Sequence, residues 1–352
     1  MNRRLLLVAY PLLPVSESSA GGAEQILWTL ERELAKRGWH TEVAACAGSR
    51  VSGELLATGE LPHALDSFEE RAKEHTERVV EECKRKNFDM ILDHSGHFFR
   101  HAGRVEQMVL ATLHLPRSLY PADAFRNIAV NVHFNCVSDS QLREFPELPR
   151  RANVVRNGIA VERFRMGGKR ANYLLWLGRV CPEKAPHLAI AAAMKAKMPI
   201  VVAGQIYPFA SHKQYWESQV LPLIDGEQVR WVPLPPFEEK VQLLRQARAL
   251  LVSSQIAETT SLVALEAMAC GTPVIAFNAG ALGEVVPKQA GFLVRGVDEM
   301  AVACKLLGEI RSQDCREWVE QHYSGHAMAE SYESLMTDLY EQERWAARRR
   351  EE

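Results

Sequence analysis

Short apolar runs alternate with longer amphipathic segments along the chain. Leu5–Tyr10 is an uninterrupted apolar run and predicts a buried strand. After it, Ile26, Leu30 and Leu34 recur at helical spacing and predict an amphipathic helix that ends at Gly38. The same criteria predict strands at Thr41–Ala45, Met90–Asp93, Val109–Leu113, Phe134–Ser138, Asn153–Val155, Tyr173–Leu177, Pro199–Ala203, Val229–Val232, Ala249–Val252, Pro273–Ala276 and Gly291–Val294, and helices such as Pro186–Lys195, Glu238–Gln246 and Leu262–Ala269 between them.

This alternation predicts an α/β protein with parallel sheets. The pattern restarts at Tyr173, and 352 residues provide for about two domains at roughly 150 residues each. We therefore expect two Rossmann-like doubly wound domains at residues 1–160 and 161–325, with the polar stretch Asn157–Ala171 as the linker. The closing charged helix, residues 326–352, is a candidate to complete the N-terminal domain.

Composition and charge narrow the function classes. The formal net charge is −2 and no basic stripe precedes Arg348–Arg350, so we expect no nucleic-acid partner. The seven cysteines are scattered without a C-x-x-C pair, which predicts a reduced, cytoplasmic chain. Pro11 cuts the first apolar run, and no run approaches the ~20 residues that span a bilayer. Trp345 beside the terminal arginines is surrounded by glutamates, so peripheral membrane contact is not indicated.

Two local patterns at predicted strand ends suit an anionic ligand. Gly21 and Gly22 open the first helix, where glycine allows close backbone approach and free N–H groups face an anion. Gly178 and Arg179 follow a later strand, with Lys184 five residues further on; two cations at a sheet edge suit a diphosphate. The alternatives are a tight turn for the glycines and solvated surface charges for the cations.

The segment from Glu258 to Glu266 carries the strongest pattern. Ser261 or Thr260 is a good N-cap for a short helix over Leu262–Ala269, which places Glu258 in the preceding loop and Glu266 in the second helical turn. Carboxylates on either side of a helix N-terminus suit a ligand with phosphate and hydroxyl groups. The alternative is a capped surface helix with one acidic face.

Histidines form the remaining candidates. His114 follows an apolar strand, a position suited to an active cleft, although a lone histidine is more often a hydrogen-bonded structural residue. His94, His97 and His101 have a spacing that a metal site can use. No cysteine or HExxH-type context accompanies them, and we favour an acceptor-facing or solvated cluster.

Together these motifs resemble family 4 glycosyltransferases, retaining enzymes of the GT-B fold in which two Rossmann-like domains face each other across a cleft. The resemblance runs almost end to end. It rests on Gly21-Gly22-Ala-Glu, His114, Val137-Ser138-Asp139-Ser140, Asn157-Gly158-Ile159, Gly178-Arg179-x4-Lys184, Glu258-x7-Glu266, Ala-Cys-Gly-Thr-Pro-Val and Gly280-Ala-Leu-Gly-Glu284.

The resemblance implies a role for each matching residue. Arg179 and Lys184 would bind the donor pyrophosphate, Glu258 the transferred sugar and Glu266 the ribose hydroxyls, with His114 over the donor sugar. Further donor contacts would come from Gly21, Gly22, Gly178, Thr260, Ser261 and Leu262. The chain departs from the common pattern at Thr259-Thr260-Ser261, where relatives have a Pro/Gly-Phe-Gly run, and at Ala185, where glycine is usual.

The implied activity is retaining transfer of a sugar from a nucleotide diphosphate donor, with UDP favoured and GDP as the alternative, to a sugar, lipid-linked or natural-product hydroxyl acceptor. No cofactor and no metal are expected. Two other classes stay open: a nucleotide-sugar epimerase of the same architecture, and a non-catalytic nucleotide-sugar-binding subunit.

Overall fold

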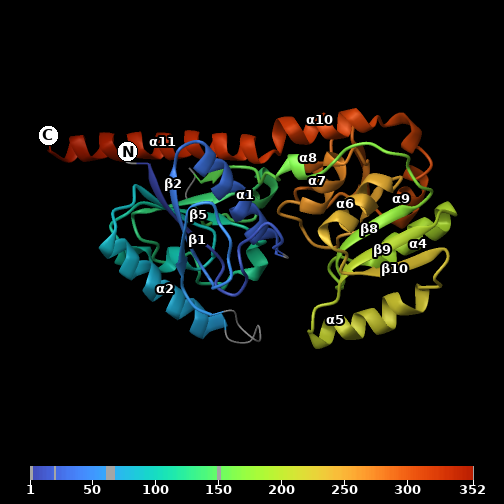
Figure 1. Ribbon diagram of the computed structural model, residues 1–352, viewed down its shortest axis with the longest axis horizontal. Coiled ribbons are helices and arrows are strands. Elements are labelled where there is room, and N and C mark those ends of the chain that lie inside the picture. Colours follow the sequence, from blue (N-terminus) through green and yellow to red (C-terminus); the bar gives the residue numbers. More distant parts are fainter. Residues whose placement is uncertain (1–2, 20, 61–67, 149–151, 352) are drawn as a thin grey trace. The chain divides into compact units, whose positions relative to one another are not determined.

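The computed structural model describes residues 3–19, 21–60, 68–148 and 152–351, without the side chains of residue 344 and residues 346–351. The side chains of Arg348–Arg350 therefore lie outside the described part of the chain. The chain divides into two compact units (Figure 1). Unit 1 comprises residues 1–159 and 324–352, and unit 2 comprises residues 160–323.

Unit 1 is built on a parallel sheet with the strand order β3-β2-β1-β4-β5-β6-β7. The inner strand β1 is fully buried at Leu5, Leu6 and Leu7, as a strand covered by helices on both faces requires. The strands are β1 (Arg4–Val8), β2 (His40–Ala45), β3 (Glu54–Ala57), β4 (Met90–Asp93), β5 (Val109–Leu113), β6 (Val132–Cys136) and β7 (Asn153–Val154), and the α-helices are α1 (Gly22–Lys36), α2 (Phe68–Arg85), α3 (Asp139–Arg143) and α11 (Gly325–Glu351).

The C-terminal helix α11 lies beside α1 in unit 1 (Figure 1). Tyr332 anchors it: the ring is 1% exposed, and its hydroxyl lies 2.7 Å from Thr112 Oγ1 on β5. Trp39 Nε1 also donates to Glu333 at 2.8 Å. A buried tyrosine needs such a hydroxyl partner, so these bonds fix where the charged helix docks.

Unit 2 is built on a second parallel sheet with the strand order β10-β9-β8-β11-β12-β13. Its strands are β8 (Leu174–Arg179), β9 (Ile200–Gln205), β10 (Val229–Pro233), β11 (Leu250–Val252), β12 (Val274–Phe277) and β13 (Gly291–Val294). Its α-helices are α4 (Pro186–Ala196), α5 (Ala210–Tyr215), α6 (Phe237–Gln246), α7 (Leu262–Ala269), α8 (Leu282–Val285), α9 (Val297–Ala303) and α10 (Ser312–His322).

The predicted fold class, α/β with two doubly wound sheets, is confirmed; that the two domains face each other across a cleft stays a prediction. Several predicted strand ends differ from the observed ones by one or two residues; for example, the strands expected at Leu5–Tyr10 and Pro199–Ala203 end at Val8 and Gln205. Two further differences have a clear structural reason. The strand expected at Phe134–Ser138 begins at Val132 and ends at Cys136, because Ser138 instead caps α3 by accepting a hydrogen bond from Gln141 N. The strand expected to end at Leu177 continues through Arg179, which pairs with Gln205.

None of the helices in the described part of the chain combines the length and the apolar character that crossing a bilayer requires.

Candidate functional site

The predicted donor cations lie at the carboxyl end of β8. Gly178 is paired with Gly204 on β9, and a Cβ atom on Gly204 would stand 1.8 Å from the Gly178 carbonyl oxygen. Gly204 has a φ of +148°, so only glycine suits this approach of the two strand ends. Arg179 ends the strand exposed, with its guanidinium 5.7 Å from the centroid of the Tyr207 ring.

Lys184 and Glu258 form an ion pair in unit 2. The Lys184 ammonium contacts Glu258 Oε1, and Ser254 Oγ donates to the same oxygen at 2.5 Å. Glu258 is only 7% exposed, and its backbone bridges to Gly280, a glycine with a φ of +58°. A Cβ atom on Gly280 would stand 2.4 Å from the Glu258 carbonyl oxygen, so only glycine lets the backbone at residue 280 approach the loop that carries Glu258 this closely.

Glu266 lies in the second turn of α7, as predicted, and Glu258 lies in the preceding loop. Lys240 on α6 pairs with Glu266, with Nζ 2.7 Å from Oε1, and both side chains are largely buried. The same ammonium lies 5.6 Å from the centroid of the Phe164 ring. Sequence reasoning missed Lys240, because nothing in its local pattern separates it from other helix-surface lysines.

The N-cap of α7 lies at the predicted residue, but in the described part of the chain the hydrogen bond expected from a capping side chain is not formed. Ser261 occupies the N-cap, but within the described residues its hydroxyl makes no capping hydrogen bond. Thr260 does not replace it, because its Oγ1 donates to the Thr259 carbonyl at 2.8 Å. Leu262 begins the helix, and the first helical N–H groups of such an end suit an anionic ligand.

In unit 1, Gly21 is the N-cap of α1 and Gly22 is its first residue. A Cβ atom on Gly21 would stand 1.9 Å from Glu24 Oε2, so the glycine makes room for a folded-back carboxylate as well as for a turn. Glu24 is 3% exposed, and burial raises the pKa of its carboxyl to about 7. A side chain that gains charge near neutral pH therefore lies in the first turn of this helix.

His114 follows β5 directly and meets His94, which follows the neighbouring strand β4. His94 Nδ1 and His114 Nε2 are 2.9 Å apart. Burial lowers the pKa of His114 to about 4 and that of His94 well below its ordinary value, so both rings are neutral at pH 7. One ring donates to the other, which constrains the tautomer of each.

The expected cluster of His94, His97 and His101 divides into two contacts. His94 pairs with His114, whereas His97 Nε2 and His101 Nε2 are 3.2 Å apart. The carboxylate of Asp93 accepts hydrogen bonds from Ser95 and from the Phe99 backbone.

The arrangement in unit 2 suits a phosphorylated, hydroxyl-rich ligand. Arg179 and Lys184 supply positive charge beside a strand end, Glu258 and Glu266 supply hydroxyl acceptors, and α7 supplies free N–H groups between them. Gly21, Gly22 and His114 belong to unit 1.

The sequence model of the family described as "Glycosyl transferases group 1" matches residues 162–325. This match spans almost all of unit 2. Over these residues the C-terminal unit is similar to this family. The resemblance drawn from the sequence is thereby confirmed at the level of the group 1 glycosyl transferases.

Several curated proteins named D-inositol 3-phosphate glycosyltransferase are similar to part of this chain. A D-inositol 3-phosphate glycosyltransferase of Frankia alni is 33% identical over 174 residues, covering 43% of this chain and 42% of the relative. Its namesake from Mycobacterium avium is 36% identical over 182 residues, covering 47% and 42%. The chain spans about half the length of the curated relatives it matches.

Solved structures match over nearly the whole chain. A sucrose-phosphate synthase from Thermosynechococcus elongatus has a TM-score of 0.79 at 19% identity and covers 96% of this chain and 99% of its own. Anabaena Alr3699/HepE in complex with UDP-glucose has a TM-score of 0.74 at 15% identity, covering 95% and 99%. At these identities the likeness shows the fold, which is the GT-B architecture of the glycosyl transferases.

Proposed function

We propose that the protein is a retaining glycosyltransferase of family 4 that moves a sugar from a nucleotide diphosphate donor, UDP rather than GDP, to a hydroxyl group of a sugar, lipid-linked or natural-product acceptor. One observation carries the proposal: the Lys184–Glu258 pair joins the cation expected at the diphosphate to the carboxylate expected at the transferred sugar. A donor places these two chemical groups next to each other. The names of the curated relatives and the UDP-glucose complex of the Anabaena protein support the same substrate class.

The proposed chemistry follows from where charge develops. As the bond between sugar and phosphate breaks, the sugar becomes oxocarbenium-like and the diphosphate gains negative charge. Arg179, Lys184 and the N-terminus of α7 stabilise that departing diphosphate. Glu258 stabilises the positive sugar ring, and the leaving phosphate deprotonates the acceptor hydroxyl on the same face.

Arg179→Ala tests the proposal. The substitution removes a preorganised cation, so we expect kcat to fall roughly 100- to 1000-fold while the fold is kept. Arg230→Ala is the matched control, since Arg230 is also exposed and lies 5.9 Å from the ring of Tyr173. Full transfer in Arg179→Ala, or an equal loss in Arg230→Ala, would contradict the pyrophosphate assignment.

Assays of reaction products and of ligand binding distinguish a glycosyltransferase from a nucleotide-sugar epimerase and from a non-catalytic binding subunit. UDP-N-acetylglucosamine incubated without acceptor should stay unchanged; its conversion to an epimer would indicate an isomerase. A thermal-shift panel of nucleotides and nucleotide sugars identifies the donor, because a ligand at 100 times its Kd adds about 2.7 kcal/mol of stability. Binding without transfer to any acceptor of the three classes would favour a non-catalytic subunit.

A further inference from the structure

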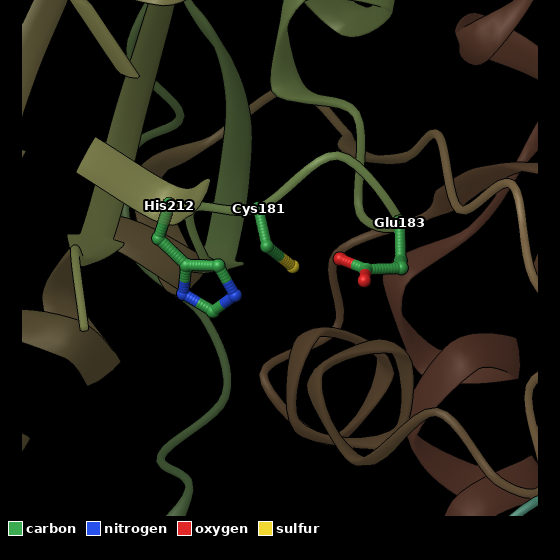
Figure 2. Close-up of side chains that lie close together, drawn as sticks. All are labelled: Cys181, Glu183 and His212. Atoms are coloured by element: carbon green, nitrogen blue, oxygen red, sulfur yellow. The ribbon is translucent and has the colours of Figure 1, made fainter. Parts of the chain in front are cut away.

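Cys181, Glu183 and His212 gather at the carboxyl end of β8 in unit 2. Each offers one metal-ligating atom, and these atoms lie within 4.8 Å of one another. Figure 2 shows the Cys181 thiol between the Glu183 carboxylate and the His212 imidazole, with one ring nitrogen turned towards the sulfur. The three side chains come from two separate elements, the loop after β8 and helix α5.

The surrounding structure holds His212 and the loop that carries Cys181, whose Sγ also donates to the Arg179 carbonyl at 3.6 Å. His212 is 8% exposed, and within the described residues its Nδ1 has no hydrogen-bond partner. Cys181 is fully buried, and its carbonyl accepts hydrogen bonds from Lys184 N at 3.2 Å and Ala185 N at 3.1 Å. Gln255 N also donates to the Glu183 carbonyl at 2.7 Å, so the loop backbone is held from two sides. The exposed Glu183 side chain can adjust.

A thiolate, an imidazole and a carboxylate form a donor set that Zn²⁺ accepts. Ligand atoms around a tetrahedral zinc are roughly 3–4 Å apart, given bond lengths of about 2.0–2.3 Å. Atoms that lie within 4.8 Å of one another need to approach by about 1 Å to reach that spacing, and the exposed side chain of Glu183 can move. We propose that Cys181, Glu183 and His212 bind Zn²⁺ with three protein ligands and one open position.

Titration of the full chain with Co²⁺, in a reducing, chelator-free buffer, tests this site without any sugar donor. A thiolate-bound Co²⁺ has a sulfur-to-metal charge-transfer absorption, so we expect that absorption to saturate at one ion per chain and to vanish when Zn²⁺ is added. Because neither donor nor acceptor is present, failure of the proposed sugar transfer would leave this result unchanged. Absence of the charge-transfer absorption would overturn the proposal.

Three variants assign the ligands. Cys181→Ser should abolish the charge-transfer absorption, whereas Cys304→Ser, which alters another buried cysteine of unit 2, should keep it. Glu183→Gln changes an exposed side chain and leaves folding intact, and loss of this ligand should weaken Co²⁺ binding at least about 10-fold. Wild-type affinity in Glu183→Gln, an absorption that persists in Cys181→Ser, or an equal loss in Cys304→Ser would each contradict the site.

Discussion

At the residue scale, the two glutamates of the candidate site in unit 2 are each held in an ion pair, Glu258 with Lys184 and Glu266 with Lys240. Both carboxylates are more than nine-tenths buried, and a buried charge needs such a partner. The two pairs have different expected fates when a donor binds. Lys184 is expected to turn to the diphosphate, whereas Lys240 is not among the expected ligand contacts and stays with Glu266.

The two glutamates should therefore separate kinetically. Glu266→Gln is expected to raise KM with kcat nearly unchanged, because the ribose does not change between ground and transition state. Glu258→Gln is expected to lower kcat, because contacts to the sugar ring strengthen as that ring gains positive charge. Steady-state kinetics with a single donor and acceptor measures both effects.

Calorimetric titration with UDP and GDP adds a check that needs no turnover. Glu258→Gln should keep its nucleoside diphosphate affinity, because the substitution frees Lys184 for the phosphates. Glu266→Gln should lose some of that affinity. If both variants lose it equally, or neither does, then the division of the carboxylates between sugar and ribose is wrong.

Glu24 should make the stability of the protein depend on pH. Burial raises the pKa of its carboxyl from 4.5 to about 7 in the folded chain, so its contribution is complete below pH 4.5 and is lost as pH rises through 7. That loss amounts to about 3 kcal/mol. Urea unfolding at pH 5 and pH 8 should show Glu24→Gln gaining stability relative to the wild type at the higher pH. A difference between the two proteins that does not change with pH would contradict the shifted pKa.

At the element scale, the start of α4 explains one departure from the family pattern. Ala185 is the N-cap with a φ of +46° and a ψ of 53°, a left-handed conformation that glycine adopts without strain. Glycine is the usual residue here in the family that the sequence resembles. The chain tolerates alanine because its methyl group is completely buried.

Ala185→Gly should change the free energy of unfolding by less than about 1 kcal/mol. Relief of a left-handed alanine gains about 1–2 kcal/mol, while the lost methyl burial and the added backbone freedom cost about 0.8 and 0.5–1 kcal/mol. Ala193→Gly is the matched control, since Ala193 is equally buried in the interior of α4 and should lose about 2 kcal/mol. Denaturant unfolding measures both, and equal losses would contradict the strain at Ala185.

The elements that the sequence predicts best are the buried strands. Met90–Asp93 and Val109–Leu113 match the observed strands β4 and β5 residue for residue, because these mainly apolar runs are buried inside a parallel sheet. Gly291–Val294 also matches β13, although that strand lies at a sheet edge with Leu293 exposed. Strand β3 escapes prediction because it lies at the sheet edge, where Glu54, Leu55 and Ala57 are exposed. Strand β3 therefore lacks the burial that produces a recognisable apolar run.

In the candidate site, the sequence likewise predicts the local positions of residues but not the contacts between residues distant in sequence. Motif spacing places Glu258 before α7 and Glu266 in its second turn, because helical geometry fixes both positions locally. The contacts of Lys240 with Glu266 and of His94 with His114 come from residues distant in sequence. Such pairings depend on how strands and helices pack, and single-sequence patterns carry no signal for them.

At the scale of the whole molecule, we expect unit 2 to bind the donor diphosphate with protein cations and to hold a metal ion at a separate site. The donor diphosphate is expected to meet only protein cations, Arg179 and Lys184, and the N-terminus of α7. The zinc site that we propose at Cys181, Glu183 and His212 uses none of these groups as ligands. Removal of divalent metal ions should therefore empty the proposed zinc site and leave binding of the donor diphosphate unchanged.

Transfer should persist in excess EDTA. We expect the protein cations to take the role that a bound divalent ion has in other transferases, so chelation should remove nothing that the departing diphosphate needs. The rate of sugar transfer with and without EDTA is the measurement, and Cys181→Ser provides a matched control that lacks the proposed zinc site.

Loss of transfer on chelation, restored by Zn²⁺, Mg²⁺ or Mn²⁺, would contradict metal independence. If that loss occurs in the wild type and Cys181→Ser is inactive from the start, the essential ion belongs to the Cys181 site; if both proteins lose transfer alike, it is bound elsewhere.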